Sequence, residues 1–360
     1  MKDMKLEEAI RRIRPADQQA AAEAKKRWDS IAKPLDSLGV LEEDLIRIAG
    51  AQGTARVRLD QKAIVVMCAD NGVVEEGVTQ TGKEVTGIVA EHMGEGTSCV
   101  CLMAARAGAR VIPVDIGMEG EPVSAGILRR KVRPGTRNFL KEPALSREET
   151  IAALETGISV AGLLKEQGVV LGGSGEMGIG NTTTSSAVLS VLLGLPASQV
   201  TGRGAGLDSR GYLRKVQVIE QGIALHRPKP DDGIDVLSKV GGLDLAGLAG
   251  FYIGCALHRI PAVLDGVICA AAAMAAVKIC PLVGDYLLAS HVSAEPAGRL
   301  ALKALGLSAA IDGGLCLGEG TGAAALFPLL DMADEVYRRM SSFGEMQVEP
   351  YRHFEEEGPC

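Results

Sequence analysis

Short β-branched runs alternate along this chain with longer stretches rich in alanine and leucine. This alternation is typical of parallel strands joined by crossover helices. We therefore predict an α/β fold: a Rossmann-like, mostly parallel sheet flanked by helices. The expected strands are residues 63–68, 110–115, 168–171, 260–264 and 287–292. The expected helices are residues 17–30, 146–167, 182–193, 209–225, 266–278, 295–305 and 321–340, and Ser146 and Asp208 are the expected caps of two of them.

The 360 residues allow one large domain or two smaller ones. Charged, helix-forming sequence concentrates at the two ends of the chain. We predict a large α/β catalytic domain over 46–335 and a small helical domain formed by 1–45 together with 336–360.

Charge and hydropathy exclude several classes of protein. The 38 Lys and Arg against 45 Asp and Glu give a net charge of −7, and no basic cluster stands out, which argues against nucleic-acid binding. The longest apolar run, 267–277, is shorter than the roughly 20 residues of a membrane span. The first residues are charged and lack the apolar core of a signal peptide. We expect a cytoplasmic protein that neither spans a membrane nor binds nucleic acid.

Cysteine and histidine spacing predicts neither disulfides nor a metal site. The five histidines are scattered without metal-ligand spacing, and we expect no metal and no cofactor. Most of the cysteines lie in Ala/Val-rich runs, where a reduced thiol behaves as a small buried apolar group. The eight are Cys68, Cys99, Cys101, Cys255, Cys269, Cys280, Cys316 and Cys360.

Three glycine-rich segments follow apolar runs, the position at which α/β sheets bind ligands. In the first, 172–187, we expect a glycine turn, Glu176, a second glycine turn and then a helix. Asn181 and Thr182 would cap that helix and contact a ligand. The segment lacks both GxGxxG and GK[ST], so it is neither a dinucleotide fingerprint nor a P-loop. The alternative is a plain strand–helix turn.

The other two glycine-rich segments each hold one charged residue between glycines. In 201–208, Arg203 is either a phosphate or carboxylate partner or part of a solvent-facing turn. In 312–324, Glu319 lies between Gly318 and Gly320, beside apolar Leu317. Partial desolvation would raise the pKa of Glu319 into the range of a general base. The alternative, a carboxylate stabilised by a helix N-terminus, predicts a lowered pKa.

Two further polar stretches follow expected strands. Asp70 and Asn71 stand at a strand end, where they are either ligand contacts or part of a polar loop. The SHVS stretch at 290–293 lacks the GxSxG elbow of a serine hydrolase. We expect the Ser293 hydroxyl to bind a sugar or phosphate, or to serve as an N-cap.

Six ordered motifs support one resemblance, and they run through most of the chain. They are KPLDSLGVLE at 33–42, ADNGVVEEGV at 69–78, GEMGIGNTT at 175–183, DG at 265–266, SHVSAE at 290–295 and LGEGTG at 317–322. With these strings the sequence resembles the nicotinate-nucleotide–dimethylbenzimidazole phosphoribosyltransferase family.

The resemblance implies a homodimer that transfers the phosphoribosyl group of nicotinate mononucleotide to a benzimidazole nitrogen, giving α-ribazole phosphate and nicotinate. It implies that Glu319 is the general base, that Glu176 lines the base pocket, and that small-molecule substrates are the partners. Contacts with the phosphoribosyl and nicotinate parts would come from Gly178, Gly202, Gly318 and Ser293. The further residues that we assign to the substrate site are Asp70, Thr79, Gln80, Met177, Asn181, Thr182, Arg203 and Leu317.

The chemistry agrees with this reading. Nicotinate leaves as a neutral ring and needs no general acid, whereas the attacking base must lose a proton to a carboxylate. The sequence departs from the family at Asn71, where a histidine is usual, and at Thr79, Thr81 and Gly82 in the base-pocket loop. Benzimidazole, a substituted benzimidazole, adenine or a phenol therefore all remain candidate acceptors. The alternatives from other classes are a dinucleotide oxidoreductase, whose motifs are missing, and a nucleotide sensor, which would not require Glu319.

Overall fold

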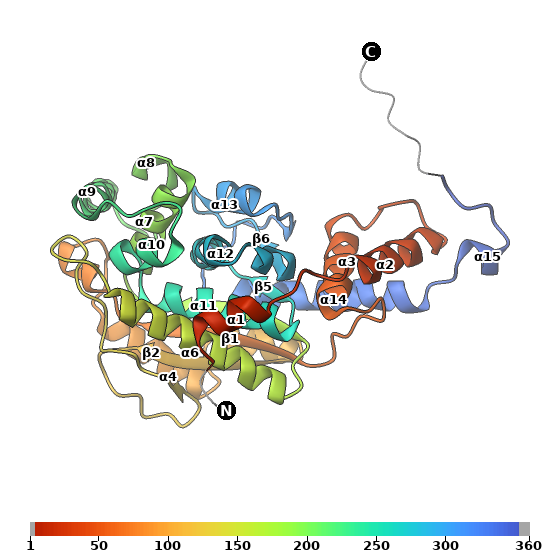
Figure 1. Cartoon of the computed structure of the whole chain (residues 1–360), viewed down its shortest axis with the longest axis horizontal. Coiled ribbons are helices and arrows are strands. Elements are labelled where there is room, and N and C mark those ends of the chain that lie inside the picture. Colours follow the sequence, from red (N-terminus) through yellow and green to blue (C-terminus); the bar gives the residue numbers. More distant parts are fainter. Residues whose placement is uncertain (1–3, 353–360) are drawn as a thin grey trace, which may run out of the picture.

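The computed structural model describes residues 4–352. Within this range the strands form one seven-stranded parallel sheet in the order β3-β2-β1-β4-β5-β6-β7. The predicted parallel sheet flanked by helices is thereby confirmed (Figure 1). This order reverses direction between β1 and β4, the arrangement of doubly wound nucleotide-binding folds. The strands are β1 (Lys62–Ala69), β2 (Ala109–Gly117), β3 (Leu128–Arg129), β4 (Leu171–Met177), β5 (Ala262–Leu264), β6 (Leu287–His291) and β7 (Ala309–Ile311).

Helices occur at all seven predicted places, with ends shifted by a few residues. They are α2 (Gln18–Ser30), α6 (Arg147–Glu166), α7 (Asn181–Leu193), α9 (Ser209–His226), α12 (Val267–Ile279), α13 (Gly298–Leu305) and α14 (Thr321–Arg339). Both predicted caps are confirmed: Ser146 forms a capping box with Glu149, and Asp208 accepts a hydrogen bond from the Gly211 N–H. Helix α13 begins three residues later than expected, so Ser293 is not its N-cap.

The strand predicted at 168–171 is wrong in position, because β4 spans Leu171–Met177. The expected glycine turn at 172–175 is therefore the middle of a buried strand. A Cβ on Gly175 would lie 2.4 Å from the Gly320 backbone nitrogen, and one on Gly173 would lie 3.0 Å from the Ala323 Cβ. Gly175 thus marks a close approach of two backbones and Gly173 a close approach of side chains from α14 and β1, which glycine in a strand permits.

Sequence reasoning missed several elements, and the longest is fully buried. Helix α11 (Leu243–His258) is apolar on nearly all sides and packs against α6 and α12, so it shows no amphipathic period. The others are α1 (Leu6–Arg12), α3 (Val40–Gln52), α4 (Glu84–Gly94), α5 (Cys99–Arg106), α8 (Ala197–Val200), α10 (Gly233–Val240), α15 (Phe343–Met346), the 3₁₀ helices Gly72–Glu76 and Pro281–Tyr286, and strands β3 and β7.

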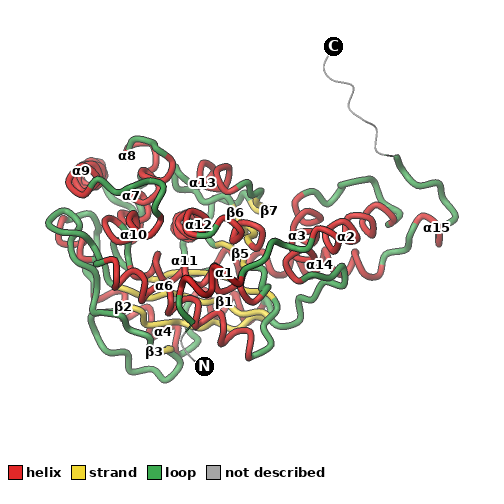
Figure 2. Tube along the Cα trace, viewed as in Figure 1, coloured by secondary structure: helices red, strands yellow, loops and turns green. Residues whose placement is uncertain are grey.

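The sheet separates two apolar cores. Along β1, Ala63, Val65 and Met67 face the core shared with α6, α11 and α12, whereas Ile64 and Val66 face the core shared with α3, α5 and α14. This alternation follows from the period of two in a strand. Helices therefore cover both faces, and the loops at the carboxyl ends of the strands are left to form a site (Figure 2).

Helices α2 and α3 project from one end of the molecule together with the second half of α14 (Figure 1). Trp28 of α2 packs on Tyr337 of α14, with ring centroids 5.1 Å apart. The buried Lys33 pairs with Glu42 of α3 at 2.6 Å. Helix α14 thus runs from the carboxyl edge of the sheet into this projecting bundle, whereas α1 contacts α6 and α11.

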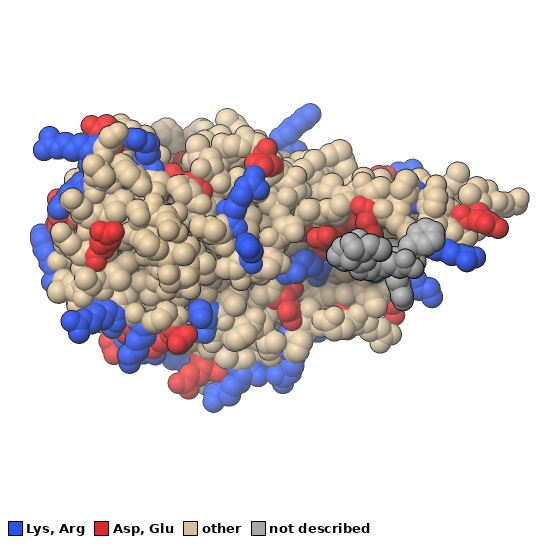
Figure 3. Space-filling model, turned by 90° about the horizontal axis from the view of Figure 1, so that it is seen from above, with Lys and Arg blue, Asp and Glu red and all other residues tan. Residues whose placement is uncertain are grey.

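The state of the cysteines, the distribution of surface charge and the search for membrane-spanning helices bear on the predictions made from composition. Five of the seven described cysteines are buried and all seven are free, whereas Cys360 lies outside the described residues. Basic and acidic side chains are interspersed over the face drawn in Figure 3. Across residues 4–352, no helix combines the length and the apolar character that crossing a membrane requires.

Candidate active site

A cavity of about 300 Å³ lies at the carboxyl ends of β4, β5 and β6. It brings together residues from all three glycine-rich segments, which are far apart in the sequence. The predicted site residues that line it are Glu176, Met177, Gly178, Asn181, Thr182, Ser293, Leu317, Gly318 and Glu319.

In the described part of the chain, helices α7, α12 and α14 each begin at this cavity. Their N-caps are Gly180, Gly266 and Gly320, which have no side chain to satisfy the first N–H groups of the helix. Asn181 and Thr182 were predicted to cap α7, but Gly180 holds that place. At α14 the Asp265 carboxylate accepts the Gly320 and Gly322 N–H groups, whereas the glycine N-caps of α7 and α12 favour binding of an anionic ligand at those helix starts.

Glu319 lies on the turn between the cavity and α14. Its φ is +62°, and its neighbours Gly318 and Gly320 have φ of +87° and +92°, so three consecutive residues are left-handed. Burial, and secondarily the charge of Asp265, raises the pKa of Glu319. The prediction that the pKa of Glu319 is raised is confirmed. The alternative, a carboxylate stabilised by a helix N-terminus, predicted a lowered pKa and is wrong.

Glu176, at the end of β4, is a buried acid of the cavity. The Asn181 side-chain amide donates a hydrogen bond to it. Burial and the nearby Asp244, Asp265 and Glu319 raise the pKa of Glu176 well above its usual range, whereas the Asn181 bond opposes this. Burial also raises the pKa of Asp244 to about 6. A protonated Glu176 can donate a hydrogen bond to a ring nitrogen, which a carboxylate cannot.

Lys215 of α9 was missed by sequence reasoning. It is 0% exposed, and its Nζ donates to Thr182 Oγ1 at 2.8 Å and to the Gly202 carbonyl at 3.2 Å. Burial lowers the pKa of Lys215 to about 8, although the negative Glu295 opposes this. Among residues 4–352, no carboxylate lies within ion-pair distance of it. A buried ammonium next to a cavity residue is a strong candidate for binding an anion.

The remaining predicted residues lie around the cavity. Thr79, Gln80 and Arg203 line an adjoining hollow of about 80 Å³, where Gln80 donates to the Gly206 carbonyl. The Arg203 guanidinium is bonded to Leu207 O and to Ser209 Oγ, so its own loop already uses it.

Two predicted residues face other surroundings. Asp70 lines a separate hollow, where its carboxylate accepts the Glu119 N–H at 2.7 Å. The Glu295 side chain packs directly on Gly202 and leaves no room for a side chain there: a Cβ on Gly202 would lie 1.6 Å from Glu295 Oε2. Their roles in substrate binding stay predictions.

Three further ionisable residues of the cavity were not assigned to the site from the sequence: Asp265, His291 and Glu295. The DG and SHVSAE strings that contain them were noted as motifs, so a signal was present. Lys215 had none, because its helix reads as an ordinary amphipathic segment. Its burial depends on the 201–208 loop folding over it.

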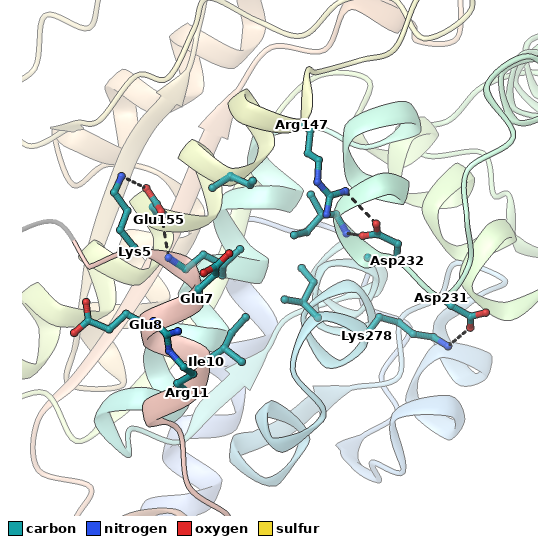
Figure 4. A pocket seen from close by; sticks show the side chains of 15 residues that line it. Lys5, Glu7, Glu8, Ile10, Arg11, Arg147, Glu155, Asp231, Asp232 and Lys278 are labelled. Carbon is teal, nitrogen blue, oxygen red and sulfur yellow. Dashed lines mark hydrogen bonds and ion pairs between the residues drawn. The ribbon is translucent and has the colours of Figure 1, made fainter.

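A larger hollow, of about 980 Å³, lies between α1, α6, α10 and α12 (Figure 4). Its charged side chains are largely paired: Lys5 with Glu155, Arg147 with Asp232, and Lys278 with Asp231. It contains none of the predicted site residues and none of the glycine-capped helix starts. We therefore place the chemistry in the smaller cavity.

Comparison with known proteins agrees with this fold. Residues 13–348 match the phosphoribosyltransferase family model, and the chain is a phosphoribosyltransferase. Relatives named nicotinate-nucleotide–dimethylbenzimidazole phosphoribosyltransferase include those of Ruminiclostridium cellulolyticum (45% identity, 98% of this chain and 100% of the relative) and Clostridium acetobutylicum (43%, 97% and 99%). The chain therefore belongs to the nicotinate-nucleotide–dimethylbenzimidazole phosphoribosyltransferase family. The crystal structure of CobT from Thermus thermophilus is similar, with a TM-score of 0.87 at 40% identity over 92% of this chain and 99% of that one.

Proposed function

We propose that this enzyme transfers the 5-phosphoribosyl group of nicotinate mononucleotide to 5,6-dimethylbenzimidazole or a related base, in the assembly of the cobalamin nucleotide loop. One observation carries the proposal: a half-buried carboxylate, Glu319, lies on a left-handed turn in a cavity that three glycine-capped helices enter. Family membership supports the substrates, because the relatives are named for them.

The cavity separates positive from negative potential. The start of α7 and the Lys215 ammonium supply positive potential beside Thr182. Glu176, Asp265 and Glu319 supply carboxyl groups on the other side. We assign the phosphate to the first side and the reacting C1′ and acceptor ring to the second, where carboxylates stabilise the positive charge that develops on the ribose.

The reaction then balances without a general acid. A ring nitrogen of the acceptor attacks C1′, and the C1′–N bond to the pyridinium breaks with its electron pair returning to the departing ring. Nicotinate leaves with a neutral ring, and inversion at C1′ gives the α linkage. Glu319 accepts the proton that the acceptor loses. Glu176 lines the pocket of the acceptor ring and helps to hold it.

We further propose that the enzyme is a cytoplasmic homodimer and that α2, α3 and the end of α14 belong to a smaller domain. The predicted division is 46–335 for the large domain and 1–45 with 336–360 for the small one. The projecting bundle of α2, α3 and the end of α14 supports a smaller domain, although its limits differ from this division, since α1 packs on α6 and α11 and α3 extends to Gln52.

Product analysis by mass spectrometry tests the reaction. The protein is mixed with nicotinate mononucleotide and, separately, dimethylbenzimidazole, benzimidazole, adenine and p-cresol. We expect a base riboside phosphate to appear together with nicotinate, and the ranking of the bases identifies the acceptor. No product with any base would contradict the proposal and favour a nucleotide sensor.

The Glu319→Gln variant tests the general base. We expect it to lower kcat by ~10²-fold or more, in line with a positioned acid–base group, while nucleotide affinity is retained. Asp312→Asn is a matched control, because Asp312 is exposed in the same loop and pairs with Arg299. Unchanged turnover in Glu319→Gln would refute the assignment.

A further inference from the structure

The backbone that carries Glu319 is held in an unfavourable conformation. A left-handed φ is unfavourable for a non-glycine residue, and such a residue persists only where its surroundings fix it. Glu319 is the one residue with a side chain in the left-handed run 318–320. Some neighbouring group must therefore fix this turn.

Asp265 makes the contacts that fix it. This residue directly follows β5 and is 3% exposed. Its Oδ2 accepts the Gly320 N–H at 2.9 Å, and its Oδ1 accepts the Gly322 N–H at 2.7 Å. Both oxygens of a single carboxylate thus bind the backbone just after Glu319, at the positive end of α14.

The opposite side of the turn is closed by β4 and by the turn itself. The Gly175 backbone leaves no room for a side chain against Glu319 and Gly320. The Thr321 hydroxyl donates to the Gly318 carbonyl at 2.8 Å. The turn is therefore held between the ends of two neighbouring strands, and Asp265 is its only carboxylate anchor among the hydrogen bonds of the described residues.

We propose that Asp265 is a positioning residue for catalysis: it fixes the turn that directs Glu319 into the cavity, and its negative charge acts on the Glu319 carboxylate. This proposal rests on the proposed function, in which Glu319 accepts the proton. It assigns Asp265 no contact with the reacting atoms.

Other ionisable groups share the cavity with Glu319, and each comes from a different place in the fold. Glu176 lies near the end of β4, His291 ends β6 and Glu295 follows it. Lys215 of α9 lies behind the lining residue Thr182. Burial lowers the pKa of His291, which favours its neutral form. The charge of Asp265 is the one that raises the pKa of Glu319 after burial itself.

The test compares Asp265→Asn with wild type in the pH dependence of kcat/KM. Asparagine has one acceptor oxygen and no charge, so the turn loosens and the negative charge is lost. We expect kcat to fall by ~10²-fold, as for a misplaced catalytic group, with little change in the KM for nicotinate mononucleotide. We also expect the acid limb of the profile to move to lower pH, because Glu319 then ionises more easily.

The acid limb separates positioning from a general loss of structure. Partial unfolding lowers the amplitude of the profile but leaves the position of the limb unchanged, so a displaced limb with a low kcat supports the proposal. Asp265→Glu retains the charge, and its limb should stay near that of wild type even if its kcat falls. Asp115→Asn is the matched control. Asp115 is a buried acid on β2, away from Glu319, and its side chain also accepts a backbone hydrogen bond, from the Met118 N–H.

Three results would overturn the proposal: wild-type kcat in Asp265→Asn, an acid limb that does not move, or a rise in KM with kcat preserved. The last would make Asp265 a substrate contact. Failure of the proposed function is recognised separately, because Glu319→Gln would then retain turnover.

Discussion

In the Lys215→Met variant, we expect the free energy of unfolding to change less with pH in the alkaline range than it does in wild type. Burial lowers the pKa of this side chain from 10.5 to about 8. The difference, 10.5 − 8, is about 2.5, and each pKa unit corresponds to about 1.4 kcal/mol, so burying the charged form costs about 3 kcal/mol. Methionine has a similar length and fills the site without this cost.

The sign of the effect follows from proton binding. Between pH 8 and 10.5 the unfolded chain keeps the Lys215 proton, whereas the folded chain has lost it. The free energy of unfolding of wild type therefore rises with pH across this window because of Lys215, and the cost is fully present below pH 8. In Lys215→Met this contribution is absent.

Urea unfolding at pH 7 and near pH 10.5 measures the effect. Trp28 is the single tryptophan and is buried, so its fluorescence reports unfolding. We expect the difference in unfolding free energy, wild type minus Lys215→Met, to become more positive by about 3 kcal/mol from pH 7 to pH 10.5. Other titrating groups are common to both proteins, so their contributions cancel in the difference between wild type and variant. The hydrogen bonds to Thr182 and Gly202 are lost at both pH values, so their contribution cancels when the two pH values are compared.

The same variant tests the phosphate assignment. Loss of a charge-assisted contact should raise the KM for nicotinate mononucleotide by ~10- to 10²-fold. Lys303→Met, at an exposed position on α13, serves as the control for both measurements. Parallel pH curves for wild type and Lys215→Met would show that the buried amine carries no charge cost and would refute the reasoning.

Two further variants test the packing around the site and the projecting bundle. Gly175→Ala places a Cβ 2.4 Å from the Gly320 nitrogen. We therefore expect the free energy of unfolding in urea to fall by about 1–3 kcal/mol and kcat to decrease. A variant equal to wild type in both would show that the turn can move. Lys33→Met leaves the buried Glu42 without its partner and should cost about 3–5 kcal/mol, whereas a loss under about 1 kcal/mol would show that the pair behaves as an exposed one.

Local sequence determined the layered architecture and most of the longer helices of this protein. Period-two and helical patterns, together with caps such as Ser146 and Asp208, depend on neighbours within a few residues. The acid chemistry of the site was also readable, since a glutamate between glycines before an apolar helix already predicts the raised pKa of Glu319. The confirmed shift has the predicted cause, which is burial.

Tertiary structure alone decided which residues surround that glutamate. In the sequence, the glycines of β4 look like a turn. They are needed because Gly175 packs against the distant Glu319 turn, and the local sequence carries no sign of that contact. Helix α11 was missed because complete burial removes the amphipathic period. Lys215 and Asp265 acquire their properties from loops and strand ends that meet only in the folded chain, because burial and charge at a site are sums over neighbours in space and not along the sequence.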